Sequence, residues 1–301
     1  MKVFIVGGTG FVGVNLANRL RAGGAEVTVL GHLPGRPRGL DPGVAVVVGD
    51  ATVAGDWQQR IPGHETVVNL AGASIFTRWT APAKELIRRS RILTTRNVVD
   101  ALPQDGGVTL ISTSAVGYYG FHDDEELGED DGPGDDFLAR LCVDWEAEAQ
   151  RARERGARVA IARFGIVLGP GGGVLGQMAP IFRAFVGGPL GSGRQWFSWI
   201  HVDDLFGALA HLAGRPGSSG PYNLTAPEPV TNRTLARELG RVLRRPALLP
   251  APGFAVRLAL GEFGEVLLKG QRVLPRRLLA EGFRFAHPGF AAALDALAPT
   301  L

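Results

Sequence analysis

Seven residues near the start of the chain, Gly7 to Gly13, have the composition and spacing of a phosphate-binding turn. They read GGTGFVG, follow an apolar, β-branched run at Val3–Val6, and precede apolar residues at helical spacing. In such a unit Gly8 permits a tight turn, Gly10 lets the backbone approach a pyrophosphate, and Gly13 lets helix and strand pack closely. The helix N-terminus adds unpaired N–H groups and a positive dipole end. The sequence therefore predicts a dinucleotide site rather than a purely structural turn, with contacts from Gly7, Thr9, Gly10, Phe11, Val12 and Gly13.

The segment after the next expected strand, Glu26–Leu30, bears on which dinucleotide binds. A site that selects NAD usually carries an acidic residue at the end of this strand, to hold the ribose 2′-hydroxyl. This chain has no acid between Glu26 and Asp41, and it has His32 and Arg36 instead. We therefore expect NADP(H) rather than NAD(H), with His32 and Arg36 near the 2′-phosphate. The alternative is that the arginines only decorate a loop rich in proline and glycine.

Other expected cofactor contacts follow from the ends of later strands. Strand 44–48 ends in Gly49-Asp50, a natural place for a contact to the adenine amine, and strand 64–70 runs into small residues that allow close backbone approach. Ligands of open α/β sheets bind at the carboxyl ends of the strands. The further contacts expected on this basis are Asp50, Leu70, Ala71, Gly72, Arg91, Ser114, Arg163 and Gly165.

These residues must be positioned by alternating strands and helices. Further strands are expected at 108–112 and 158–168, and helices at about 80–101 and 137–155, with Leu86 among the buried positions of the first helix. Alternation of this kind predicts an α/β fold with a doubly wound parallel sheet, a Rossmann fold.

The composition of the sequence changes at Gly169, where a glycine-rich segment begins. We expect a dinucleotide-binding domain of residues 1–168 plus about 199–225, and a smaller, mainly helical substrate lobe of residues 169–198 and 226–301. A strand is expected at 199–202, with Asp203 capping the helix that follows it. Further helices are expected near 231–243, 253–268 and 290–297.

Composition limits the function classes. The single cysteine, Cys142, excludes an internal disulfide and fits a reducing compartment. No apolar run is long enough to span a membrane and the start is no signal peptide, so we expect a cytoplasmic protein without membrane contact. Residues 233–277 hold ten basic and three acidic residues, but at helical intervals without interleaved aromatics, so we expect no nucleic-acid partner. Residues 122–136 hold nine acidic residues and are expected to form a solvated loop.

Several motifs together resemble the extended and atypical short-chain dehydrogenases/reductases. They are GGTGFVG at 7–13, NLAG at 69–72, STSAVGYYG at 112–120 and WIHVDD at 199–204. Finer features resemble an NAD-dependent epimerase-like subgroup of poorly defined function with its own C-terminal domain. These are RWT at 78–80, LCVDWE at 141–146, GGPLGSGRQWFSWIHVDD at 187–204 and KGQRVLPRRLLAEGFRF at 269–285. The resemblance implies a Rossmann fold and a nicotinamide cofactor.

The chain departs from that superfamily at its usual catalytic pair, a tyrosine with a lysine four residues later. The three tyrosines, Tyr118, Tyr119 and Tyr222, are followed at that distance by histidine, aspartate and alanine. The resemblance aligns Leu138 with the missing tyrosine and Cys142 with the missing lysine. It also aligns Ser114 with the superfamily's serine, and Arg91 with an asparagine of the preceding helix.

Two interpretations of these residues remain open. In one, Arg91, Ser114, Tyr118 and Cys142 are catalytic, with Tyr118 or Tyr119 as proton donor and the guanidinium holding a substrate oxyanion. In the other, Cys142 is a buried apolar residue and the tyrosines pack under the second lobe. The first predicts an oxidoreductase or epimerase-like enzyme acting on a small polar carbonyl or hydroxyl compound. The second predicts a non-catalytic NADP(H)-binding sensor or scaffold. A homodimer fits either interpretation, and no metal ligand set is expected.

Overall fold

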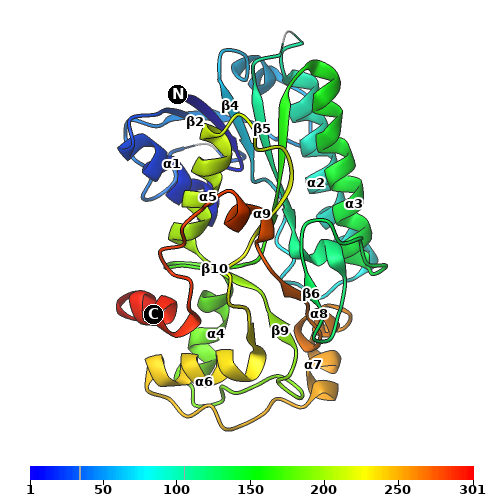
Figure 1. Cartoon of the computed structure of the whole chain (residues 1–301), viewed down its shortest axis with the longest axis vertical. Coiled ribbons are helices and arrows are strands. Elements are labelled where there is room, and N and C mark those ends of the chain that lie inside the picture. The colour runs from blue at the N-terminus through cyan, green and yellow to red at the C-terminus, as the bar shows by residue number, and fades with distance from the viewer. Residues whose placement is uncertain (34, 105) are drawn as a thin grey trace.

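The computed structural model describes residues 1–33, 35–104 and 106–301 and is built on a seven-stranded parallel sheet (Figure 1). The strand order is β11-β7-β5-β4-β1-β2-β3, so the chain winds outward in both directions from the centre. The strands are β1 (Lys2–Val6), β2 (Glu26–Gly31), β3 (Ala45–Val48), β4 (Thr66–Asn69), β5 (Thr109–Ala115), β7 (Arg158–Phe164) and β11 (Gly220–Leu224). The predicted doubly wound α/β fold is confirmed.

Helices cover both faces of this sheet. On one face α1 (Phe11–Ala22) and α5 (Val202–Gly214) bury Leu16 and Leu205 against strand residues such as Val27. On the other face α2 (Ala81–Ala101) and α3 (Phe137–Gln150) bury Val98 and Ala149 against strand residues. The two apolar layers hold the carboxyl ends of β1, β4, β5 and β7 at one edge of the sheet, where a cofactor would bind.

Most of the remaining elements gather beyond this edge, in the lower part of Figure 1, whereas the short helix at 276–280 packs against β11 of the main sheet. A separate apolar cluster joins α4 (Gly173–Arg183), α6 (Asn232–Leu243) and α10 (Phe290–Leu297). The other elements are short: β6 (Glu126–Leu127), β8 (Ile166–Leu168), β9 (Trp196–Phe197), β10 (Trp199–His201), β12 (Val230–Thr231), α7 (Gly253–Leu260), α8 (Phe263–Leu268), β13 (Arg272–Val273) and α9 (Arg276–Ala280). None of the described helices is long and apolar enough to cross a membrane.

Two predicted elements are broken at glycines. The strand expected at 158–168 divides into β7 of the main sheet and β8, which pairs with β10. The break falls at Gly165, where a Cβ would lie 2.7 Å from the Ser198 carbonyl oxygen. The helix expected at 253–268 divides into α7 and α8, because Gly261 takes a left-handed φ of +62°. Hydrophobic periodicity continues across both breaks and therefore did not predict them.

Three local predictions were wrong, and a fourth held only in part. His201, not Asp203, caps α5, since its Nδ1 accepts the Asp203 N–H at 3.1 Å. Leu86 is 61% exposed, and its neighbour Ile87 takes the buried position in α2. The acidic segment 122–136 is not wholly solvated, because β6 pairs with β13 and Glu129 is only 4% exposed. The helix expected at 137–155 is α-helical only as far as Gln150 and ends as a 3₁₀ turn at 151–155.

Candidate functional site

The glycine turn after β1 has the shape that a dinucleotide site requires, with one change in the predicted roles. Gly7 makes the left-handed turn, at φ +77°, and a Cβ there would lie 2.9 Å from the Ala71 backbone. Gly8, to which the turn was assigned from the sequence, instead packs on β2, because its Cβ would lie 2.5 Å from Cβ of Val29. A Cβ at Gly13 would lie 2.4 Å from the Gly7 carbonyl oxygen, so the predicted close packing of helix on turn is confirmed.

Gly10 differs from these glycines because the protein itself leaves room for a side chain there. The nearest atom to a Cβ at this position is the Gly7 carbonyl oxygen at 3.5 Å, and the backbone is extended at φ −80°, ψ 177°. Gly10 is also the N-cap of α1, and in the described part of the chain no side chain caps this helix. The first N–H groups of α1 therefore open onto a surface that a phosphate could approach closely.

The predicted adenosine contacts lie at the ends of β2 and β3. Thr9 covers Gly31, where a Cβ would lie 2.4 Å from the Thr9 Cγ2. Asp50 accepts hydrogen bonds from the Thr52 hydroxyl at 2.7 Å and the Thr52 N–H at 2.8 Å, which lower its pKa. Its other oxygen lies 4.0 Å from Nδ1 of the exposed His32.

Arg36 braces the loop that follows β2. Its guanidinium donates to the carbonyl oxygens of Asp41 at 2.7 Å and Val44 at 3.0 Å. Both acceptors precede β3, whose first residue, Ala45, pairs with Thr28, while its last residue, Val48, pairs with Gly31. The Arg36 guanidinium therefore lies at the amino end of β3, and the structure does not bring it to the other predicted adenosine contacts at the carboxyl ends of β2 and β3.

Sheet register brings three polar residues into one row at the other side of the candidate site. Ser114 of β5 lies beside Arg163 of β7, which lies beside Asn223 of β11. Arg163 forms a two-bond ion pair with Glu146 of α3, with Nε–Oε1 at 2.8 Å and Nη2–Oε2 at 2.9 Å. The Ser114 hydroxyl donates to the same carboxylate at 2.7 Å. We call these residues and Tyr119 the Arg163 network: Ser114, Tyr119, Glu146, Arg163 and Asn223.

Tyr119 closes this network inside the protein. Its hydroxyl accepts from Arg163 at 2.9 Å and donates to Asn223 Oδ1 at 2.8 Å, while the residue is fully buried. Burial raises the pKa of Tyr119 to about 12, although Arg163 opposes the shift. Burial also opposes the charge of Arg163, but the hydrogen bonds and charge of Glu146 outweigh it and raise the pKa of the guanidinium. The Tyr119 hydroxyl therefore stays protonated at neutral pH, and its hydrogen bonds are made to Arg163 and Asn223.

Glu129 extends the network into the C-terminal region and was missed by the sequence analysis. Its carboxylate accepts the N–H of Asn223 at 3.0 Å and the N–H of Arg277 at 3.3 Å. Burial raises its pKa against these hydrogen bonds. In the sequence Glu129 is one of nine acids in a short segment, so composition gave no signal that singled it out.

Cys142 lies on α3 with its side chain turned into the protein. The residue is 3% exposed, and its sulfur lies 3.8 Å from the Ala115 carbonyl oxygen. Burial, reinforced by the charge of Glu146, raises the pKa of the thiol to about 11. These surroundings favour the packing interpretation of Cys142, since a reactive cysteine needs a thiolate near neutral pH.

Arg91 lies beside Gly72, the small residue expected to admit the cofactor. Its Nη1 donates to the carbonyl oxygens of Ala73 and Ile87, both at 3.1 Å, and its guanidinium lies over the Trp145 ring at 5.2 Å. A Cβ at Gly72 would lie 3.0 Å from the Arg91 Cζ. Burial lowers the pKa of Arg91, and no carboxylate contributes to the shift. In the part of the chain that the structure describes, no acid pairs with Arg91, which thus brings a positive charge close to the end of β4.

Among the described residues, Tyr118 is the tyrosine whose hydroxyl has no hydrogen-bond partner in the protein. The hydroxyls of the other two are occupied, Tyr119 as described and Tyr222 by a 2.7 Å bond to Glu281. Tyr118 is half-buried, and its ring lies 3.5 Å beneath the Arg163 guanidinium. The structure therefore brings Ser114, Tyr118, Cys142 and Arg163 together around the ends of β5 and β7. Gly7, Gly10, Ala71 and Gly72 lie around the turn, and Gly165 is explained by its contact with Ser198.

Comparison with known proteins gives the family. Residues 3–225 match the model of the NAD dependent epimerase/dehydratase family, and residues 251–297 match a domain of unknown function, DUF1731. The chain is 41% identical to the chloroplastic epimerase family protein SDR39U1 homolog of Arabidopsis thaliana, over 99% of this chain and 86% of that protein. The crystal structure of human epimerase family protein SDR39U1 with NADPH is 36% identical, covers 100% of both chains and has a TM-score of 0.88. UDP-glucose 4-epimerase of Thermus thermophilus, at 21% identity and a TM-score of 0.81 over 100% of this chain and 98% of that chain, shares the fold. The chain belongs to the NAD dependent epimerase/dehydratase family and is of the SDR39U1 type, with a C-terminal DUF1731 domain.

Proposed function

We propose that this protein binds NADP(H) at the glycine turn and the end of β2. The observation that carries the proposal is Gly10, the one glycine of the turn at which the protein has room for a side chain. A glycine is required there only if another molecule approaches the backbone, and the uncapped N-terminus of α1 suits a pyrophosphate.

The preference for NADP(H) rests on the residues after β2. No carboxylate stands between Glu26 and Asp41 to hold a ribose 2′-hydroxyl, while the side chain of His32 is exposed just after β2. The NADPH in the crystal structure of the human relative supports the same choice. Calorimetric titration of the purified protein with NADPH and, separately, NADH tests it. Tighter binding of NADPH is expected, and equal or absent binding of the two would refute the preference.

We further propose an oxidoreductase or epimerase-like activity on a small polar carbonyl or hydroxyl compound. The bound nicotinamide would supply hydride transfer chemistry. Tyr118 would exchange a proton with the substrate oxygen, because its hydroxyl is not occupied in the Arg163 network. Arg163 holds the Tyr118 ring in place from above, and Arg91 would attract an anionic or polar substrate group.

The activity is tested by a screen of small carbonyl and hydroxyl compounds that follows nicotinamide absorbance. Tyr118→Phe should lower turnover on any substrate found by at least about 100-fold, the lower end of general acid–base contributions. Tyr119→Phe is the matched control, because it removes a buried hydroxyl from the adjacent residue. Equal turnover by Tyr118→Phe and the unsubstituted protein would exclude Tyr118 as proton donor.

The alternative is an NADP(H)-binding sensor or scaffold without turnover. It is favoured by one observation: Ser114 and Cys142, which align with catalytic positions of the superfamily, are turned into internal contacts with Glu146 and Ala115. NADPH binding with no turnover across the screen, together with unchanged NADPH affinity in Tyr118→Phe, would support this alternative.

A further inference from the structure

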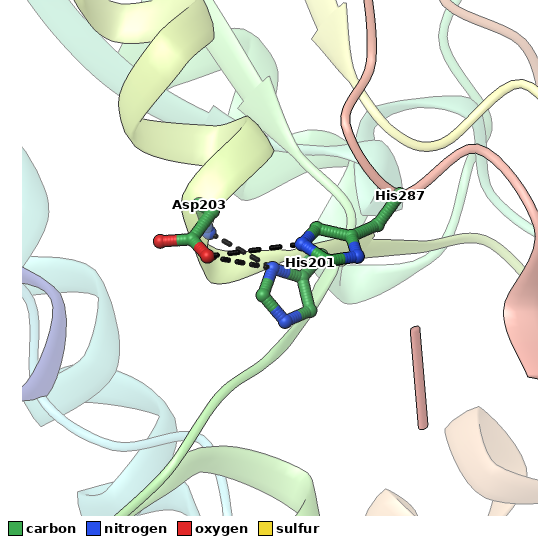
Figure 2. Close-up of side chains that lie close together, drawn as sticks. All are labelled: His201, Asp203 and His287. Carbon is green, nitrogen blue, oxygen red and sulfur yellow. Dashed lines mark hydrogen bonds and ion pairs between the residues drawn. The ribbon is translucent and has the colours of Figure 1, made fainter. Parts of the chain in front are cut away.

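A cluster of three ligand-type side chains joins the start of α5 to the C-terminal segment (Figure 2). His201 ends β10, Asp203 lies in the first turn of α5, and His287 comes from the segment that precedes α10. One ligand atom from each of the three lies within 4.8 Å of the others. The sequence did not predict this group, because His287 is 84 positions from Asp203 and only the fold brings it near.

The distances in this cluster suit a shared ion better than direct hydrogen bonds. Oδ2 of Asp203 lies 3.6 Å from His201 Nδ1 and 3.8 Å from His287 Nε2, both beyond the usual hydrogen-bond range. Two ligand atoms bound tetrahedrally to one zinc ion lie about 3.4 Å apart, since each bond is about 2.0–2.1 Å. Each nitrogen is thus within a few tenths of an ångström of this distance from the carboxylate oxygen, and the ligand atoms of all three residues lie within 4.8 Å of one another.

Hydrogen bonds orient the side chains of His201 and Asp203. The Asp203 N–H donates to Nδ1 of His201, which puts the lone pair on that nitrogen, as a metal ligand requires. An ion would compete with this bond for the lone pair. Oδ1 of Asp203 accepts from Arg19, so Oδ2 remains free to bind.

His287 is fixed through its backbone. Asp204, itself 3% exposed, accepts the N–H of Ala286 at 2.6 Å and that of His287 at 2.9 Å. The two imidazole rings are stacked with centroids 3.8 Å apart, His201 being buried and the His287 side chain 22% exposed. One side of the cluster is therefore open for an ion to enter and for water to complete its coordination.

We propose that His201, Asp203 and His287 bind a divalent transition-metal ion of the zinc type. Two imidazole nitrogens and one carboxylate oxygen form a ligand set that zinc uses with water in the fourth position. The bound ion would fasten the segment before α10 to the first turn of α5, because its ligands come from both. The site is separate from the glycine turn, so the proposal does not depend on NADP(H) binding.

Calorimetric titration of the chelator-treated, tag-free full chain with Zn²⁺ tests this site. We expect saturation at one ion per chain and a higher melting temperature with zinc than with EDTA. His287→Gln should weaken binding by at least about tenfold, and Asp203→Asn should do the same. His122→Gln is the matched control, because His122 is also partly exposed and also lies beside a carboxylate, that of Glu125. It should bind like the unsubstituted protein.

Two outcomes would overturn the proposal. One is the absence of saturable zinc binding by the unsubstituted chain. The other is full zinc affinity in both His287→Gln and Asp203→Asn, which would place any bound ion elsewhere. The melting temperature in EDTA shows whether each variant is folded, and using two variants keeps the test decisive if one of them fails to fold. NADPH affinity, measured in EDTA, should be unchanged in His287→Gln, which separates this test from that of the cofactor site.

Discussion

Arg163 and Glu146 face each other as a parallel, two-bond ion pair between β7 and α3, with side chains only 3% and 13% exposed. The pair also holds the Ser114 hydroxyl and lies over the Tyr118 ring. The charged groups of Arg163 and Glu146 thus bind each other at the end of the sheet and are not available to bind a substrate. Tyr118 and Arg91 remain as the candidate side chains for chemistry.

Removing one partner of this pair should be strongly destabilising. Arg163→Met leaves Glu146 buried without its cation, and we expect the free energy of unfolding to fall by about 3–5 kcal/mol in urea denaturation. Arg237→Met is the control, since the Arg237 side chain is 71% exposed and its partner Glu238 keeps a second ion pair with Arg241, and it should change stability by less than about 1 kcal/mol. The double variant Arg163→Met/Glu146→Leu should recover part of the loss. A loss below about 1 kcal/mol for Arg163→Met would contradict this account of the pair.

Cys142 should be inert in the folded protein. Because burial raises the pKa of its thiol from the ordinary value of 9.0 to about 11, the thiolate fraction at pH 8 should be about 100-fold lower than in the unfolded chain. Labelling with a thiol-specific reagent should therefore be slow in buffer and fast in urea. Cys142→Ala should bind NADPH like the unsubstituted protein. Native labelling as rapid as unfolded labelling would show an accessible thiolate and revive the catalytic interpretation.

Glu281 should make part of the stability depend on pH. Burial opposes its ionisation, but hydrogen bonds from Tyr222, His211 and Ser218 outweigh burial and lower its pKa below the ordinary value of 4.5. A carboxyl with a lowered folded-state pKa contributes stability that is present above its unfolded pKa and is lost as pH falls through the folded pKa.

We therefore expect Glu281→Gln to reduce the free energy of unfolding by about 1–3 kcal/mol at pH 7. The difference from the unsubstituted protein should shrink as pH falls below 4.5. Urea denaturation at a series of pH values measures this difference. A difference that grows towards low pH would reverse the predicted sign.

The sheet and its glycine turn could be predicted because their signals are local. Short apolar runs alternate with helical periodicity, and the glycine pattern includes Gly7 and Gly13, where the backbone itself requires glycine, and Gly10, where the protein leaves room for a side chain. The role of each glycine in the turn could not be predicted from the sequence. Gly7 and Gly8 are adjacent, and only the structure shows that Gly7 has the left-handed φ. The breaks at Gly165 and Gly261 were missed because apolar periodicity does not stop there.

The interactions of the candidate site could not be predicted because they depend on sheet order and register. Arg163 meets Ser114 and Asn223 only because β5, β7 and β11 are neighbours. Glu146 was visible in the sequence only as part of a family motif, and nothing there distinguished its carboxylate from that of its surface neighbour Glu148. The sequence could likewise not show that Tyr119 is enclosed and that Tyr118 is not.

The most direct test of the central claim is NADPH titration of Gly10→Ala beside Gly214→Ala. Neither methyl group meets a protein atom closer than 3.5 Å, so both variants should fold and keep the melting temperature of the unsubstituted protein or exceed it slightly. Only the methyl group at position 10 would stand where the pyrophosphate must approach. We expect Gly10→Ala to bind NADPH at least about tenfold more weakly and Gly214→Ala to bind it unchanged. Equal NADPH affinity in the two variants would contradict the assignment of the glycine turn as the cofactor site.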